Sequence, residues 1–318
     1  MRQLTSKTLR GLWSAIPTPW KSDGGIDEGM LHRNCERLAT IARVDGIYTT
    51  DSDGEFYAIE LDEFRLLARM FGKAMEAAGV DAAMGVTWSH TQGIIDRLKA
   101  ARDAGIPNAH VGYPMFMPMA KSDVDRFWDD LARAAPEARW IHYAHPRLGP
   151  TMTGADYTRI ARQHPRQLIG TKIGNVSMLE TTEIITHSPQ LAHFAVDPFL
   201  APAAMLGARG NYSYWVNTMP RWMRRYMDAC VAGDWTTAAA CHHKLTQWEQ
   251  THVQPIRNAG HLHGIIGKAR AALTGFLEDT GITRAPYSPV PEEMQRKLKA
   301  AFQEFWVQEL ADEPSAAR

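Results

Sequence analysis

The sequence predicts an α/β protein, a (β/α)₈ TIM barrel with a C-terminal helical appendage. Short apolar runs alternate with longer amphipathic segments, and eight such runs are present. The expected strands are Leu12–Pro17, Gly46–Thr50, Asp81–Val86, Ala109–Tyr113, Trp140–Ala144, Leu168–Gly174, His193–Pro198 and Gly210–Val216. A strand followed by a helix eight times over is typical of a closed parallel barrel. A doubly wound sheet is the alternative, but no glycine-rich phosphate loop follows the first run.

The segments between the runs have helical periodicity. The clearest are Glu28–Ala42, Asp62–Ala78, Thr91–Ala104 and Ser122–Ala134. In the last of these, apolar residues from Val124 onward recur at three- and four-residue steps, which places them on one helix face. After the eighth run the alternation stops, and the expected helices are Trp235–Thr251, Ile265–Asp279 and Pro291–Leu310. We therefore expect a barrel over residues 1–233 and a helical region over residues 234–318 that packs on it.

The composition limits the class of function. Lysine and arginine together number 35, as do aspartate and glutamate, so no net field favours nucleic acid or an anionic membrane. Three cysteines without CxxC spacing argue against a disulfide framework, a metal centre or a redox pair. No N-terminal apolar run indicates a signal peptide, and no stretch is apolar enough over a sufficient length to span a bilayer. We expect a cytoplasmic enzyme that binds neither nucleic acid nor membrane.

One of the ten lysines lies inside an expected strand. Active-site residues of this fold lie at the carboxyl ends of the strands, and Lys172 is near the end of the run Leu168–Gly174. Burial lowers the pKa of a lysine, and a neutral amine can attack a carbonyl carbon to form an imine. The other nine lysines are expected on helices or loops, in solvent. The alternative for Lys172 is an ion pair inside the barrel.

Two further strand ends carry residue types suited to the same chemistry. Alternation along the fifth strand allows Tyr143 to point into the barrel beside the strand of Lys172, where a phenol can relay protons. A packed barrel tyrosine is the alternative. After the second run, Ser52 and Asp53 precede Gly54 in a turn whose backbone N–H groups can bind a carboxylate. An ordinary strand-to-helix turn has the same composition.

These residues together resemble the dihydrodipicolinate synthase and N-acetylneuraminate lyase superfamily. Residues 51–55 stand in the place of its GTTGE loop, residues 143–146 match its YNxP motif, and residues 170–172 match its GxK motif. The resemblance implies that Lys172 forms a Schiff base with a small 2-oxo acid and that Tyr143 relays protons. It also implies that the covalent imine on Lys172 replaces an organic cofactor, and that the chain forms a homo-oligomer, commonly a tetramer. No metal site is evident in the sequence.

Within that superfamily, the chain is most similar to the hydratase-aldolases that cleave aromatic benzylidenepyruvates. The likeness rests on residues 112–116, 143–146, 214–215, 263–270 and 285–291. Trp215 stands at the end of strand eight, where that branch has an active-site tryptophan, and His263 stands where it has an asparagine. The expected substrate-binding residues are Ser52, Asp53, Gly54, Phe116, Trp215 and His263. Aromatic residues at strand ends are also common in cores, so packing is the alternative for Phe116 and Trp215.

The departures from the family pattern bear on the substrate. Phe116 stands where the synthases have a second tyrosine, and Ser52 and Asp53 replace the two loop threonines, so lysine biosynthesis is not expected. Asp53 would repel a substrate carboxylate unless its side chain turns away to cap the following helix. Three functions stay open: a pyruvate-dependent hydratase-aldolase that cleaves an aryl-substituted 2-oxo acid to an aldehyde and pyruvate, a dehydratase or lyase of a 2-keto-3-deoxy sugar acid, and a catalytically silent protein that binds a 2-oxo acid.

Overall fold

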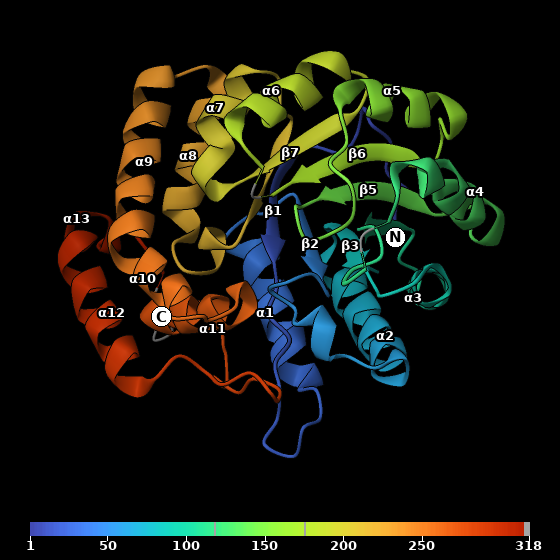
Figure 1. Cartoon of the computed structure of the whole chain (residues 1–318). Coiled ribbons are helices and arrows are strands. Elements are labelled where there is room, and N and C mark those ends of the chain that lie inside the picture. The colour runs from blue at the N-terminus through green and yellow to red at the C-terminus, as the bar shows by residue number, and fades with distance from the viewer. Residues whose placement is uncertain (118, 175, 315–318) are drawn as a thin grey trace.

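Eight parallel strands close into a barrel in the computed structural model, which describes residues 1–117, 119–174 and 176–314 (Figure 1). The strands pair in chain order, and β1 pairs with β8 to complete the ring. Their bounds are β1 Gly11–Ala15, β2 Gly46–Thr49, β3 Asp81–Gly85, β4 Asn108–Val111, β5 Arg139–Ala144, β6 Leu168–Ile173, β7 Ala192–Val196 and β8 Gly210–Ser213. All eight apolar runs contribute a strand, so the predicted fold class is confirmed.

Helices lie outside the strands and cover the barrel (Figure 1). They are α1 Glu28–Thr40, α2 Leu61–Ala78, α3 Thr91–Asp103, α4 Val124–Ala134, α5 Gly154–Gln163, α6 Met178–His187, α7 Leu200–Met205 and α8 Pro220–Ala232. Short 3₁₀ helices precede four of them: η1 Phe56–Ala58, η2 Lys121–Asp123, η3 Asp197–Phe199 and η4 Trp215–Asn217. Local sequence sets several helix starts. Thr153 and Ser177, for example, each form a capping box at the start of α5 and α6.

Alternate strand residues fill the inside of the barrel, and large side chains face glycines. A Cβ on Gly46 would lie 2.4 Å from the Trp13 ring, and a Cβ on Gly210 would lie 2.3 Å from the Phe194 ring. These glycines leave room for aromatic rings on the neighbouring strands. The lower interior is therefore packed solid, and chemistry is confined to the carboxyl end of the barrel.

The chain after α8 forms a group of helices along one side of the barrel (Figure 1). They are α9 Trp235–Trp248, the π-helix η5 Glu249–Val253, α10 Gln254–Asn258, α11 His263–Thr274, α12 Glu292–Phe305 and α13 Val307–Leu310. The start of α11 lies against the loop after β2 so closely that a Cβ on Gly264 would be 2.2 Å from the Ser52 carbonyl oxygen. This close approach places α11 over the expected carboxylate-binding loop. Among the described residues, no helix has the length and apolarity needed to cross a membrane.

Candidate active site

Lys172 lies at the carboxyl end of β6, inside the barrel, with 3% of its surface exposed. In the register of β5 and β6 it is opposite Tyr143, and its Nζ is 4.1 Å from the centre of the Tyr143 ring. Both residues occupy inward-facing positions of neighbouring strands. Strand alternation thus brings an amine and a phenol together at the carboxyl end of the barrel.

A buried carboxylate contacts the same amine. Asp51 Oδ2 is 2.7 Å from Lys172 Nζ and 2.7 Å from His110 Nδ1, and all three side chains are buried. The other oxygen, Oδ1, is also buried and has no hydrogen-bond donor among the described residues. The structure therefore contains the ion pair that was the alternative for Lys172.

The backbone around Asp51 holds the carboxylate in the barrel. The strand β2 ends at Thr49, and Thr50 takes a left-handed φ of 63°, an outlier for a β-branched residue. The Thr50 hydroxyl donates to the Gly85 carbonyl at 2.8 Å. A Cβ on Gly85 would lie 2.2 Å from Asp51 Oδ1. The carboxylate thus occupies space that exists because β3 ends in a residue without a side chain.

The ion pair reverses the pKa shift expected for Lys172. Burial acts to lower the pKa of this amine, but Asp51 and Tyr143 outweigh it and raise the pKa above its ordinary value. Burial acts to raise the pKa of Asp51, yet Lys172 and His110 lower it to about 2. An ammonium and a carboxylate therefore face each other, and the pKa shift of Lys172 is opposite to the one that burial alone would cause. Burial also raises the pKa of Tyr143, which remains a phenol.

Three aromatic rings from inward-facing strand positions pack together next to the Lys172 ammonium. Tyr48, His110 and Tyr212 contact one another, with ring centres 4.6 to 5.0 Å apart. Lys172 Nζ donates to the Tyr48 hydroxyl at 3.2 Å and lies 4.4 Å from the centre of that ring, an arrangement that attracts a cation. None of the three is among the site residues expected from the sequence. Their inward-facing positions on β2, β4 and β8 are the signal that could have identified them.

Asp53 faces the C-terminal helices rather than Lys172. Its Oδ1 is 3.5 Å from Nε2 of His263, the first residue of α11. It does not cap the helix that follows, because η1 begins without a side-chain cap. Burial is the main cause that raises the pKa of Asp53 to about 6, and burial followed by the charge of Arg270 lowers the pKa of His263 well below its ordinary value. Near neutral pH, an ionised Asp53 therefore faces a neutral imidazole.

Ser52 and Gly54 complete the loop beside the two catalytic candidates. The Ser52 side chain acts to lower the pKa of the Tyr143 phenol, against the larger effect of burial. The Gly54 carbonyl accepts a hydrogen bond from the Thr18 hydroxyl at 2.7 Å, and a Cβ on Gly54 would lie 2.4 Å from the Thr50 nitrogen. The glycine is thus required for the loop to fold back on itself. The structure brings six of the predicted site residues together at the carboxyl end of the barrel, called the barrel mouth below: Lys172, Tyr143, Ser52, Asp53, Gly54 and His263.

The two aromatic candidates lie elsewhere. Phe116 follows β4 with a left-handed φ of 79°, and its side chain is 91% exposed. The expectation that Trp215 ends strand eight is wrong, because β8 stops at Ser213 and Trp215 begins η4. The Asp197 carboxylate accepts the backbone N–H of Trp215 at 2.8 Å, and that of the preceding residue at 3.0 Å, which turns the chain. The indole is buried against rings of the C-terminal helices, namely Trp248, Phe302 and Trp306.

A second lysine is buried, contrary to the expectation that all lysines except Lys172 are solvated. Lys268 of α11 lies 3.1 Å from Glu55 Oε1 and donates to the carbonyls of Thr18 at 2.7 Å and Ile282 at 2.8 Å. Glu55 also accepts from the Trp20 indole at 3.0 Å. The contacts with Thr18 and Glu55 join α11 to the loops after β1 and β2, so the helix that begins at His263 is fixed relative to the site.

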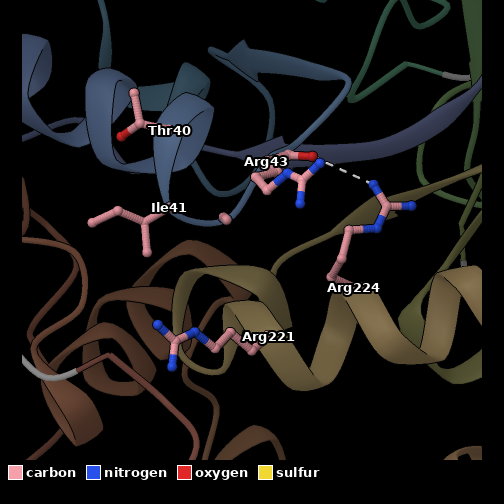
Figure 2. Close-up of a pocket in the computed structure, with 6 residues that line it drawn as sticks. Thr40, Ile41, Arg43, Arg221 and Arg224 are labelled. Carbon is pink, nitrogen blue, oxygen red and sulfur yellow. Dashed lines mark hydrogen bonds between the residues drawn. The ribbon is translucent and has the colours of Figure 1, made fainter.

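Other parts of the described surface offer less chemistry. A hollow of about 470 Å³ lies between the end of α1 and the start of α8 (Figure 2). Its Arg224 guanidinium is paired with Asp45 and Asp228, and its Arg221 guanidinium donates to the Asp312 carbonyl. None of the predicted site residues lines it. No group of three or more histidine, cysteine or carboxylate side chains among the described residues is arranged to hold a metal ion.

The fold and the gathered side chains define a barrel enzyme with a lysine on its sixth strand. Over residues 8–305 the sequence matches the Dihydrodipicolinate synthetase family, and the chain belongs to that family. The family resemblance found in the sequence is therefore confirmed, and the chain is an enzyme of the lyase class.

Individual relatives are distant and differ in activity. The 4-hydroxy-tetrahydrodipicolinate synthase of Methanothrix thermoacetophila is 23% identical over 300 residues, covering 92% of this chain and 95% of that protein. The trans-O-hydroxybenzylidenepyruvate hydratase-aldolase of Pseudomonas aeruginosa is 24% identical over 311 residues, covering 92% and 90%. Sequence identity thus does not separate the two branches.

Solved structures share the fold. A prophage protein of the dihydrodipicolinic acid synthase family from E. coli K12, in complex with pyruvate, has a TM-score of 0.84 at 22% identity, covering 93% of this chain and 98% of that one. The N-acetylneuraminate lyase from Fusobacterium nucleatum has a TM-score of 0.80 at 19% identity, covering 93% and 99%. These similarities establish the architecture of the barrel together with its C-terminal helices.

Proposed function

We propose that the protein is a Schiff-base lyase that cleaves a 4-hydroxy-2-oxo acid into pyruvate and an aldehyde, with Lys172 as the nucleophile. One observation carries the proposal: a buried amine lies at the carboxyl end of β6 with the Tyr143 ring 4.1 Å away on the neighbouring strand. Membership of a lyase family supports it.

The chemistry follows from the imine. The Lys172 nitrogen bonds to C2 of the acid, the carbonyl oxygen leaves as water, and the resulting iminium attracts electrons from the adjacent carbon. When the C4 hydroxyl loses its proton, the C3–C4 bond breaks, its electrons form an enamine, and the aldehyde leaves. Protonation of C3 and hydrolysis of the imine then release pyruvate and restore the amine. Tyr143 is within reach of the nitrogen and serves as the proton relay.

The loop at residues 52–54 is the proposed carboxylate site. The Asp53 side chain is directed at His263, which leaves the backbone N–H groups of Ser52 and Gly54 for an anion. Ser52 lies beside Tyr143 and adds a hydroxyl donor. A 2-oxo acid held in this way presents its C2 to Lys172.

Two classes of substrate are considered, which differ in the substituent on C4. An aryl group, as cleaved by a hydratase-aldolase that first adds water to a C3–C4 double bond, is supported by the relative of that activity at 24% identity. A polyhydroxylated chain, as in a 2-keto-3-deoxy sugar acid, is favoured by one feature of the mouth. The Asp53 and His263 side chains lie there as a polar pair 3.5 Å apart, whereas Trp215 lies in the core.

Intact-mass measurement after incubation with pyruvate and borohydride tests the proposal. The wild type should gain the mass of one reduced pyruvate, and Lys172→Ala should gain none. An adduct retained in Lys172→Ala would overturn the assignment of the nucleophile. Binding of pyruvate by calorimetry without an adduct in the wild type would favour the catalytically silent alternative.

A second assay separates the two substituents. Pyruvate release is followed with an aryl-substituted 2-oxobutenoate and with a 2-keto-3-deoxy sugar acid as substrates. Cleavage of the sugar acid with a higher kcat/KM, reduced by His263→Ala, would identify the polar pair as the recognition element. The reverse order would assign the protein to the hydratase-aldolase reaction.

A further inference from the structure

We propose that Asp51 is a catalytic base that takes a proton from the Lys172 ammonium so that the amine can attack the 2-oxo acid, and that His110 positions it. This inference rests on the proposed imine chemistry and assigns a residue to its first step. Asp51 stands at the first position of the family's GTTGE loop, where that pattern has a glycine. A carboxylate at this point is therefore a feature of this chain rather than of the family pattern.

Asp51 contacts the Lys172 amine directly, and its carboxylate has an oxygen that accepts no other hydrogen bond among the described residues. Asp51 Oδ2 is 2.7 Å from Lys172 Nζ, a hydrogen-bond distance along which a proton can move. The buried Oδ1 has no donor among the described residues, so one oxygen keeps its lone pairs free. Gly85 supplies the space, since a Cβ there would lie 2.2 Å from Oδ1.

The charges around Lys172 single out Asp51 as the acceptor. Side chains that contact the amine or act on it electrostatically come from β2, β4, β5, β8, the loops after β2 and β5, and the start of α11. They are Tyr48, Asp51, Asp53, His110, Tyr143, His145, Tyr212 and His263. Among these described groups, Asp51 is the carboxylate that touches Nζ, while Asp53 faces His263. The aromatic faces stabilise the ammonium and accept no proton from it.

The step balances in protons and electrons. The ammonium transfers one proton to Asp51, and the neutral amine uses its lone pair to form a bond to C2 of the acid. The carbonyl π electrons move to oxygen, which takes a proton from the new N–C centre to give a carbinolamine. The proton held by Asp51 then goes to the carbinolamine hydroxyl, by way of the Lys172 nitrogen or Tyr143. Water leaves, the nitrogen lone pair forms the iminium, and Asp51 is a carboxylate again.

His110 acts through Asp51. Because Asp51 is ionised at rest, His110 Nδ1 must carry the hydrogen in the 2.7 Å contact and donate it to Oδ2. The imidazole packs against the Tyr48 and Tyr212 rings, with ring centres 4.6 Å apart in both contacts. His110 thus holds the Asp51 carboxylate in place next to Lys172, and the imidazole is linked to the amine through Asp51.

The test measures the rate of imine formation with pyruvate as a function of pH, by timed borohydride quench and intact mass. In the wild type the ammonium and its base are present together above the pKa of Asp51, about 2, and below the raised pKa of Lys172, so the rate should be nearly flat between these limits. In Asp51→Asn the amine must lose its proton to solvent, so the rate should rise about tenfold per pH unit below the pKa that burial then sets for Lys172. At pH 7 the variant should be about 10² to 10⁴ times slower than the wild type.

Two further variants keep the test decisive. Asp51→Gly places the glycine of the family loop at this position and should show the same steep profile. It replaces Asp51→Asn in the test if that variant folds poorly. His110→Phe should shift the acid limb of the profile to higher pH, because His110 lowers the pKa of Asp51. Asp197→Asn removes another buried carboxylate of the barrel, one bonded to Asn211 and backbone N–H groups, and it should keep the flat profile.

Each outcome decides one question. A flat profile in both Asp51 variants, or a rate at pH 7 equal to or above that of the wild type, would show that Asp51 only holds the ammonium in place and would overturn the inference. A steep profile already present in the wild type would do the same. A wild type that forms no adduct at any pH would instead count against the proposed function.

Discussion

Two buried lysines show how the barrel mouth differs from the junction between the barrel and the C-terminal helices. Lys172 and Lys268 are each 3% exposed. Each has a buried carboxylate as its nearest charged partner, Asp51 at 2.7 Å for the first and Glu55 at 3.1 Å for the second, and Lys268 also lies 4.0 Å from Asp279 Oδ1. Burial and ion pairing therefore do not distinguish a reactive lysine from a structural one.

The remaining contacts do distinguish them. Lys268 donates to two backbone carbonyls and also lies 3.1 Å from Glu55 Oε1, so three oxygens surround its three N–H donors closely. Beyond Asp51, Lys172 has a phenol oxygen at 3.2 Å and the faces of the Tyr48 and Tyr143 rings at 4.4 and 4.1 Å. The Lys268 ammonium has an acceptor for each N–H and joins segments of backbone. The Lys172 ammonium lies among aromatic faces at a strand end, where it can lose a proton and a ligand can approach it.

The largest expected difference is between Lys172→Ala and Lys268→Ala. The first should lose pyruvate trapping completely, because it removes the amine that lies at the carboxyl end of β6 beside Asp51 and Tyr143. The second should keep trapping but lose about 3–5 kcal/mol of unfolding free energy, since it leaves Glu55 buried without its partner. Urea unfolding and adduct mass measure the two effects. Complete loss of trapping in folded Lys268→Ala would break the distinction.

Removal of the Tyr143 hydroxyl should have the next largest effect. Tyr143→Phe keeps the ring beside Lys172 and deletes the proton relay, so kcat for cleavage should fall about 10² to 10⁴-fold. Tyr157→Phe is the matched control, because it deletes a buried phenol that bonds to His142 in the layer outside the barrel. An equal loss in both variants would indicate general damage to the fold rather than a role for Tyr143.

The sequence was sufficient for the fold and for the central pair of residues. Alternation with a period of two on the strands, and of about 3.6 on the helices, is local information. It gave the eight strands and placed Tyr143 and Lys172 on neighbouring inward-facing positions. The motif around residues 170–172 pointed to the same lysine.

The partners of these residues could not be predicted because they depend on contacts between distant segments. The Asp51 carboxylate lies in the barrel because Thr50 takes a left-handed φ and because Gly85, on another strand, leaves space. Lys268 is buried because Glu55, far away in sequence, lies beneath it. Trp215 lies outside β8 because the backbone N–H groups of Tyr214 and Trp215 donate to the Asp197 carboxylate instead of continuing the strand. None of these contacts has a local signature.

Asp53 lies on the border between the two regions, and its charge should make stability depend on pH. Its pKa in the folded state is about 6, against 3.8 ordinarily, so ionisation above pH 6 destabilises the fold. The penalty fades as pH falls from about 6 to about 4. Asp53→Asn should therefore be about 1–3 kcal/mol more stable than the wild type at pH 7.5, with little difference near pH 4. Urea unfolding at both pH values checks this, and an advantage that does not change with pH would contradict it.

The smallest expected effect on catalysis concerns Trp215, which the sequence assigned to the substrate and the structure places in the helical junction. The indole packs on Trp248 and Trp306, with ring centres 6.1 and 5.5 Å away. Trp215→Phe leaves a gap in this cluster and should cost about 1–3 kcal/mol of stability, while KM for the cleaved substrate stays unchanged. Phe302→Leu, in the same cluster, should behave alike. A raised KM with unchanged stability in Trp215→Phe alone would instead show that the indole reaches the substrate, and the reactive region would then extend beyond the ends of the strands into the junction.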